Sequence, residues 1–343
     1  MTTPAELIES IPNIPGIDPV LFEQLNSPYY YSAYPPITQY IFGLSVKIFG
    51  DNVLANIIFF RIIILFAEFG TIMLLYRLTK KFQLPYSLVV LYAFNPLVII
   101  ELTGNLHFEA IMIFFLVLSI YWLVTGRQVL SAVTFALAVG VKLVPLLFLP
   151  LLLKQIGTSR SIRYYLIVGI TTVLFCLPFL NIQAVSHYVS SLSLYFQAFE
   201  FNASIYYLIK GIISPLGNSN INTNLGIVLS VVIFVAIVTF AVVKRDRGWI
   251  SLVSGMLFCL TVYYLLAAHI HPWNLTPLLV LTIFTGFRYM LPWSLLVILT
   301  YITYRTFPYS ENLWLVAIEY IVVAGWFIYE WRARRKALQS IAG

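Results

Sequence analysis

The sequence predicts an all-α polytopic membrane protein, because it is long, strongly apolar and poor in charge. Its 343 residues are 61% hydrophobic and 10% charged, with a mean hydropathy of +0.92. A water-soluble domain carries roughly 25% charged residues, so a soluble globular fold is excluded. We expect one bundle of about ten membrane helices, each close to the length that crosses a bilayer.

The excess of 20 Lys and Arg over 13 Asp and Glu gives a formal net charge of +7. In a membrane protein such an excess reports loop orientation, so we expect no nucleic-acid partner. Cys176 and Cys259 lie in apolar runs and are expected to be buried small side chains without a disulfide or metal.

The elements follow from apolar runs between charges and turn residues. We expect an external N-terminal segment at 1–52 with an outer-face amphipathic helix at 36–49, a bundle at 53–331, and a basic cytoplasmic tail at 332–343. The membrane helices are expected at 53–77, 85–101, 107–125, 162–180, 223–243, 249–268, 274–287, 289–306 and 313–331.

One further stretch, 128–153, is interrupted by Lys142, Pro145 and Pro150. We expect it to enter and leave on the same side, as two short helices or a re-entrant loop. Broken backbone at membrane depth is tolerated where it lines a cavity or packs against protein.

If the other spans alternate, 15 of the 20 basic residues fall on one side, which the positive-inside rule makes cytoplasmic. They are Arg77, Lys80, Lys81, Arg127, Lys154, Arg160, Arg163, Lys244, Arg245, Arg247, Arg288, Arg332, Arg334, Arg335 and Lys336. The opposite, external face is then acidic and rich in Tyr, His and Asn. No signal peptide or earlier span carries the N-terminus there, so spontaneous translocation and a missing first span both remain open.

Two groups of polar residues are expected at the outer face of the first half. Tyr34 belongs to a Tyr- and Pro-rich cluster, which is either an interfacial aromatic belt or a ring-stacking wall for a substrate. His107 and Glu109 open a helix near Asn105 and form a better polar floor for a sugar or phosphate than a metal pair. Glu101 alone is read as part of a solvated loop.

Three ionisable residues are expected within membrane segments. Lys142 costs at least about 2.5–3.5 kcal/mol to insert, which favours a function, although the side chain could snorkel toward the cytoplasmic surface. Arg61 and Glu68 lie on the same face of one helix and are expected to brace the bundle.

In the second half, His269, His271 and Trp273 follow a span at the outer face. They form either an interfacial turn or a phosphate-binding group, because no third ligand has metal-site spacing. Arg305 is one of few cations expected near this face, where it could clamp a phosphate.

The order of these motifs resembles the GT-C class of membrane glycosyltransferases. The closest likeness is to polyprenol-phosphate-mannose-dependent mannosyltransferases of the bacterial and archaeal kind, with a fainter likeness to the first mannosyltransferase of GPI synthesis. It covers nearly the whole chain. The motifs are Ser27-Pro28-Tyr29 through Tyr34-Pro35-Pro36, Asn95-Pro96, Asn105-Leu106-His107-Phe108-Glu109, Gly140-Val141-Lys142-Leu143-Val144-Pro145, and His269-Ile270-His271-Pro272-Trp273.

The resemblance implies inverting transfer of a hexose, with mannose favoured, from a polyprenyl-phosphate donor to a lipid or glycan acceptor hydroxyl in the cell envelope. No nucleotide sugar or other cofactor is implied. The expected substrate-binding residues are Tyr34, Asn105, His107, Glu109, Lys142, His269, His271, Trp273 and Arg305.

In this family an Asp in the first outer loop acts as general base, and the region upstream of Gly16-Ile17-Asp18-Pro19 that would hold it is absent. Asp18 stands where the family tends to have Asn before Pro. Glu109 is therefore the remaining candidate, the catalytic base is left unassigned, and the chain is expected to be truncated or a divergent relative with little activity. A transporter or lipid flippase and an inactive structural relative are the alternatives.

Overall fold

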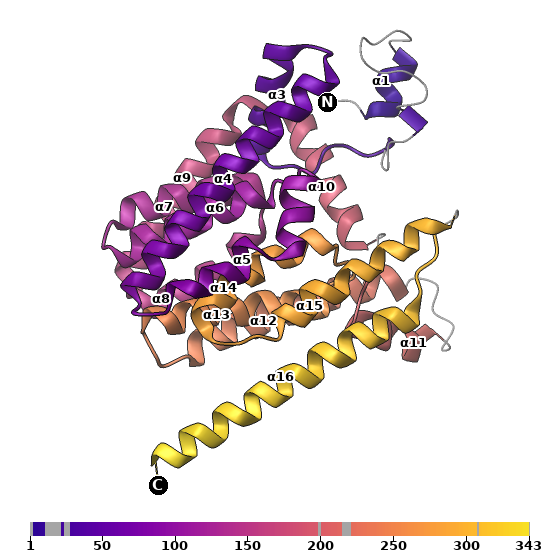
Figure 1. Ribbon diagram of the computed structural model, residues 1–343. Helices are drawn as coiled ribbons and strands as arrows, with labels where there is room; N and C mark the ends of the chain where they lie inside the picture. The colour runs from indigo at the N-terminus through magenta and orange to yellow at the C-terminus, as the bar shows by residue number, and fades with distance from the viewer. Residues whose placement is uncertain are drawn as a thin grey trace.

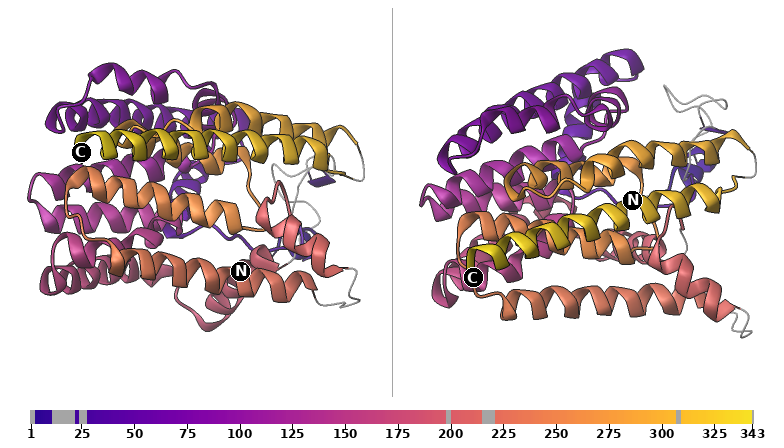
Figure 2. Two further views of the ribbon diagram at one scale, coloured as in Figure 1. Left: turned by 90° about the horizontal axis from the view of Figure 1, so that it is seen from below. Right: turned by 60° about the horizontal axis from the view of Figure 1, so that its bottom comes forward.

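The computed structural model describes residues 3–10, 22–23, 28–197, 200–214, 221–306 and 309–342. These residues form helices that run side by side in one bundle, with α16 (Leu313–Ala342) along its edge (Figures 1 and 2). Asp18 and Ser27 lie outside the described residues. The only β-structure in the described part is a single parallel bridge between Phe201 and His269.

Five described helices are long and apolar enough to cross a membrane: α4 (Val53–Lys81), α9 (Thr158–Cys176), α12 (Ile221–Val243), α13 (Trp249–Leu266) and α16. A bent pair at 86–104 makes six. Four shorter apolar segments complete the bundle: α6 (Glu109–Val124), α7 (Gln128–Val141), 144–155 and 272–285. The expectation of an all-α polytopic membrane protein is confirmed, whereas ten full-length spans are not found among the described residues.

The membrane helix expected at 85–101 is present as a bent pair of helices, because the helix breaks at Asn95-Pro96. It consists of η1 (Tyr86–Val89), α5 (Val90–Ala93) and the π-helix η2 (Val98–Gly104), with a 60° bend. Proline disfavours helical backbone at the preceding residue and cannot donate a backbone hydrogen bond, so the helix ends there. Asn95 stabilises the break, since its side chain accepts from Leu97 N and donates to Ser294 Oγ.

The interrupted segment at 128–153 has the expected form of two short helices. After α7 the backbone is extended at Lys142 (φ −150°, ψ 143°), and η3 (Val144–Phe148) and α8 (Leu149–Gln155) lead back. Lys142 therefore lies at the turn of a helical hairpin, at the opposite end of α7 from Arg127.

The amphipathic helix expected at 36–49 is α3 (Pro36–Phe49), which packs against this hairpin. Thr38 donates from Oγ1 to the carbonyl of Val141, 3.2 Å away. A Cβ atom at Gly140 would come within 2.5 Å of the Ile37 side chain, so glycine permits the close approach of α3. This contact fixes α3 beside Lys142.

Between α9 and α12 lie α10 (Ile182–Gln197) and α11 (Ile205–Ile213). The second half of the chain departs from the expected elements in two places. The span expected at 289–306 is α15 (Met290–Leu296) followed by the 3₁₀-helix η7 (Val297–Arg305). The expected separate tail is the end of α16. Arg334 donates to the Thr285 carbonyl, and Glu330 accepts from the backbone N–H groups of Arg288 and Tyr289, which hold this end against α14 (Thr276–Thr285).

Arg61 and Glu68 brace α4 as expected, but through separate partners. Tyr92 donates to the Glu68 carboxylate at 2.8 Å, and the Arg61 guanidinium donates to the carbonyls of Thr103 and Gly104 at 3.3 Å. Both contacts hold α4 against the broken 86–104 segment, which leads directly into the loop before α6.

Candidate functional site

The centre of the candidate site is an ion pair between Glu109 and Lys142. Glu109 is the first residue of α6 and is 2% exposed, and the Lys142 ammonium contacts its Oε1. The second carboxylate oxygen, Oε2, is buried without a hydrogen-bond partner among the described residues. The interpretation of Lys142 as a residue that snorkels toward the Arg127 end is wrong, because its ammonium is held at the other end of the hairpin.

A stack of four aromatic rings lies beside this pair. His107 stacks on one face of Trp273 with ring centroids 3.9 Å apart, and His271 stacks on Trp273 at 4.3 Å. Phe201 continues the stack against His271 at 4.6 Å. The charge of Lys142 acts on His107, His269 and His271, so the stack and the ion pair belong to one group of residues.

Backbone hydrogen bonds hold in place the site residues from the second half of the chain, Phe201 and the segment 268–273. Phe201 N donates to the Ala268 carbonyl at 3.1 Å, and Ile270 N donates to the Phe201 carbonyl at 2.8 Å. This short bridge aligns the segment after α13 with the segment before α11. The 3₁₀-turn η6 (Pro272–Leu275), with Pro272 in its first turn, then presents Trp273 to His107.

Glu101 contacts Asn105 and His107, which belong to the part of the site from the first half of the chain. The expectation that Glu101 lies in a solvated loop is wrong. Its side chain is fully buried in η2 and accepts hydrogen bonds from Tyr301 Oη at 2.8 Å and Asn105 Nδ2 at 3.2 Å. His107 Nε2 lies 3.4 Å from Glu101 Oε2. Leu106 has a positive φ of 60°, which turns the chain sharply between η2 and α6 and directs His107 toward Trp273.

Burial keeps the three histidines of the group neutral. Burial is the largest cause in each case; it lowers the pKa of His107 and His269 to about 4 and that of His271 to about 3. The charge of Lys142 adds to the effect on all three. Lys142 is therefore the cation of this group at neutral pH.

Tyr34 also reaches the group, whereas Arg305 does not. Burial raises the pKa of Tyr34, and the charges of Lys142 and Glu109 act on it in opposite directions, so Tyr34 lies near the ion pair. Arg305 is exposed and has no hydrogen bond or ion pair with any residue that the structure describes. Its neighbour Tyr304 contacts Phe201, with ring centroids 5.9 Å apart.

Sequence reasoning missed Phe201 and Tyr301, because neither carries a charge or a motif. It also missed Asn202, which follows Phe201 and donates hydrogen bonds to the carboxylates of Glu311 and Glu319. Asn202 Nδ2 donates to the buried Glu319, which also accepts from Trp293 Nε1 at 2.7 Å, and Asn202 N donates to Glu311. These contacts fasten the Phe201 segment to α16.

The group offers a single cation, a buried carboxylate and an aromatic wall, which suits a phosphate next to a sugar ring. Within the described part of the chain, no three His, Cys, Asp or Glu side chains converge in a way that could hold a metal ion.

Residues 29–156 match the family described as alpha-(1->6)-mannopyranosyltransferase, N-terminal domain. Over these residues the chain is similar to the N-terminal domain of a GT-C mannosyltransferase family, which confirms the resemblance seen in its motifs. No curated protein matches the chain.

The matched stretch contains Tyr34, Asn105, His107, Glu109 and Lys142, and the remaining ring-stack residues lie beyond it. The match supports glycosyltransferase activity of the mannosyltransferase kind, which involves a sugar donor and an acceptor, and the apolar helices fit a membrane-embedded protein.

Proposed function

We propose that the protein transfers a hexose, mannose in the first instance, from a polyprenyl phosphate to a hydroxyl of a lipid or glycan acceptor, with inversion at the anomeric carbon. The observation that carries this proposal is the Lys142 ammonium at the turn of the hairpin, paired with buried Glu109 and flanked by the His107–Trp273–His271 stack.

Lys142 is proposed to bind the phosphate of the donor. A charge-assisted hydrogen bond between an ammonium and a phosphate is stronger than a neutral one and needs no metal. Glu109 holds the ammonium at the hairpin turn, and donor binding would divide the Lys142 charge between phosphate and carboxylate. Neutral His271 lies beside Lys142, so it adds polarity without a second charge.

The stack of His107, Trp273 and His271 is proposed to form the aromatic wall beside the sugar ring, with Trp273 held between the two histidines. Aromatic faces bury the apolar face of a pyranose while its hydroxyls bind polar neighbours. The unpartnered Oε2 of Glu109 and the side chain of Asn105 are the polar groups available for those hydroxyls. Tyr34, near the ion pair and on the chain before α3, is proposed to cover the bound substrate.

In the reaction, the acceptor oxygen bonds to the anomeric carbon as the bond from that carbon to the phosphate oxygen breaks. The polyprenyl phosphate leaves with the electron pair, and the acceptor proton passes to a base. The Glu109 carboxylate is already engaged by the Lys142 ammonium through Oε1. We therefore propose that Glu109 positions substrate and Lys142, and we leave the base unassigned.

The active face is proposed to be external, with the protein in the cell membrane and the end of α16 in the cytoplasm. This orientation follows from the distribution of Lys and Arg among the connections. The polyprenyl-phosphate donor would then enter from the outer leaflet, between helices, while the acceptor approaches from outside.

The test is sugar transfer by the purified chain in lipid vesicles that contain a polyprenyl-phosphate mannose and candidate lipid acceptors. Transfer that is lost in Lys142→Ala and kept in Arg305→Ala would support the proposal. Release of donor label into the vesicle lumen without a transfer product would instead indicate a transporter or flippase and contradict it.

A further inference from the structure

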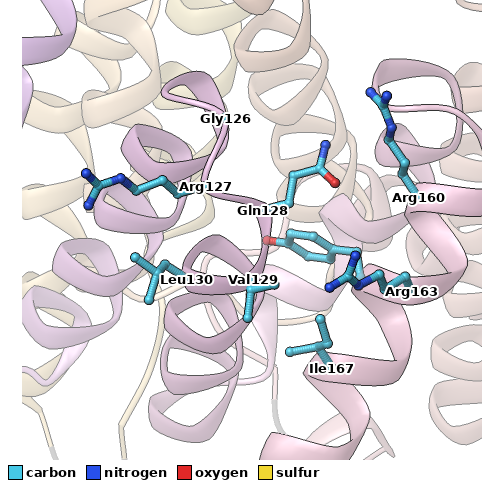
Figure 3. A pocket seen from close by; sticks show the side chains of 9 residues that line it. Gly126, Arg127, Gln128, Val129, Leu130, Arg160, Arg163 and Ile167 are labelled. Atoms are coloured by element: carbon cyan, nitrogen blue, oxygen red, sulfur yellow. The ribbon is translucent and has the colours of Figure 1, made fainter.

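A cavity lined by three arginines lies at the Arg127 end of α7, away from the Glu109–Lys142 pair. Its volume is about 370 Å³. The lining residues are Gly126, Arg127, Gln128, Val129, Leu130, Arg160, Arg163, Tyr164 and Ile167. Figure 3 shows Arg163 between Gln128 and Ile167, with Arg127 and Arg160 reaching toward opposite sides.

None of the three arginines has a carboxylate partner among the residues that the structure describes. The guanidinium of Arg127 lies 4.9 Å from the centre of the Trp122 ring, and no side-chain hydrogen bond joins Arg160 or Arg163 to a described residue. The Tyr164 hydroxyl is engaged by Ser119 and Ser131, so the floor of the cavity is fixed by a buried network. The cavity thus concentrates positive charge that the protein leaves unneutralised.

The helix ends around the cavity add to this positive potential. Arg127 is the N-cap residue of α7, and Arg160 is the third residue of α9. Neither helix has an acidic residue in its first turn. Free backbone N–H groups and the helix dipole make an N-terminus favourable for anions and unfavourable for cations. Arg127 and Arg160, at these two N-termini, and Arg163, one turn further along α9, are therefore stabilised when an anion binds in the cavity that they line.

The surface of α9 continues from the arginines into an apolar stripe. Ile167, Ile170 and Leu174 follow Arg163 at intervals of four, three and four residues, so all four lie on one face. Ile170 is 60% and Leu174 58% exposed. Because α9 is a membrane-spanning helix with only 11% of its apolar window buried, this stripe faces lipid.

We propose that this cavity and stripe bind one anionic phospholipid, with its phosphate headgroup in the cavity that Arg127, Arg160 and Arg163 line and an acyl chain along Ile167, Ile170 and Leu174. Basic pockets between membrane helices are the kind of site that anionic headgroups occupy. Arginine suits this site because its planar fork binds phosphate oxygens in a bidentate manner. The site is separate from the proposed transferase site and does not depend on it.

The experiment measures lipid binding to the purified full chain in a neutral detergent. Dioleoylphosphatidylglycerol, dioleoylphosphatidylcholine and inorganic phosphate are titrated separately, with bound lipid counted by native mass spectrometry. Phosphatidylglycerol is expected to bind at one saturable site. Arg160→Gln/Arg163→Gln should weaken it about thirtyfold, since each basic residue contributes about 1 kcal/mol to anionic-lipid attraction.

The matched control is Arg245→Gln/Arg247→Gln, two exposed arginines between α12 and α13 that do not line the cavity. It should leave phosphatidylglycerol affinity unchanged. An equal loss in both double variants would overturn the site, because it would show attraction by diffuse charge alone. Inorganic phosphate that competes with phosphatidylglycerol at equal affinity would assign the cavity to a free anion and overturn the lipid.

Folding of each variant is checked by helical circular dichroism and elution volume. Both arginines are exposed, so their loss should leave the fold intact. If the double variant fails to fold, Arg163→Gln alone replaces it, with an expected loss of affinity of about fivefold. Unchanged affinity in that variant would overturn the proposal.

Discussion

The Lys142 ammonium contacts the carboxylate of Glu109, 33 positions away in the chain, and so joins the hairpin turn after α7 to the first turn of α6. The contact brings the charge of a broken membrane segment to the loop that carries His107. It also makes each residue depend on the other, since either charge alone would be left in a buried setting.

Removing one charge of this pair should lower the free energy of unfolding more than removing both charges together. Lys142→Met leaves the buried Glu109 carboxylate uncompensated, which should lower the free energy of unfolding by about 3 kcal/mol. Adding Glu109→Gln should recover most of that loss. Thermal unfolding in detergent measures the cycle. The more exposed pair Lys210–Glu200 is the control, and Lys210→Met should cost about 1 kcal/mol or less.

Trp273 should control donor affinity through its two stacking contacts. Trp273→Ala removes both, each worth about 0.5–1.5 kcal/mol, and should raise KM for the donor about tenfold; Trp273→Phe should have a smaller effect. Initial rates against donor concentration measure both. Trp314→Ala, a change of a tryptophan that is 82% exposed, is the control. Equal effects of Trp273→Ala and Trp314→Ala would contradict a role for the stack.

Stability should fall in mild acid because of the buried histidines. Each unfolded histidine binds a proton near pH 6.5, whereas burial lowers the pKa of folded His271 to about 3. Between these values the unfolded state binds more protons, so the free energy of unfolding decreases as pH drops below about 6.5. The slope is up to about 1.4 kcal/mol per pH unit for each such histidine.

Thermal unfolding between pH 7.5 and 4.5 measures this slope, and His271→Asn should make it shallower. If the free energy of unfolding of the wild type does not change between pH 7.5 and 4.5, the histidine side chains are hydrated in the folded protein.

Arg305→Ala should leave donor affinity close to that of the wild type, in contrast to Lys142→Ala. Arg305 is exposed and has no hydrogen-bond or ion-pair partner in the described part of the chain, although it follows Tyr304 at the edge of the stack. Donor titrations of the two variants, side by side, check this. A loss of affinity in Arg305→Ala as large as in Lys142→Ala would return Arg305 to the phosphate site.

Reporters fused after Arg127 and after Ile156 should give the same, cytoplasmic location. The hairpin of α7, η3 and α8 turns at Lys142 and returns, so it does not transfer the chain across the membrane. A reporter after Gly343 should share that location, and one within 267–271 should be external. Opposite locations for the first two reporters would contradict the hairpin in the membrane.

The sequence predicted the polytopic helical class, the amphipathic helix at 36–49 and the broken form of 128–153, because apolar length and proline act locally. It also named Tyr34, His107, Glu109, Lys142 and Trp273. It did not predict the 60° bend at Asn95-Pro96, since the apolar run continues on both sides of the break.

The contacts within the site could not be predicted from the sequence, for a different reason. The stack of His107 on Trp273 and the support of Glu101 by Tyr301, 200 positions apart, depend on how helices distant in the chain pack. Phe201 gives no local signal at all, because a phenylalanine in a membrane protein is ordinary until its neighbours are known.

The rings of the stack come from two separate parts of the chain, His107 from the stretch before residue 156 and Trp273, His271 and Phe201 from the stretch after it. Each part keeps its helices through local hydrogen bonds, while the distance between His107 and Trp273 depends only on how the parts pack together. A detergent that loosens helix packing should therefore inactivate the enzyme before any helix melts. Helical content is thus a poor guide to whether a preparation is active.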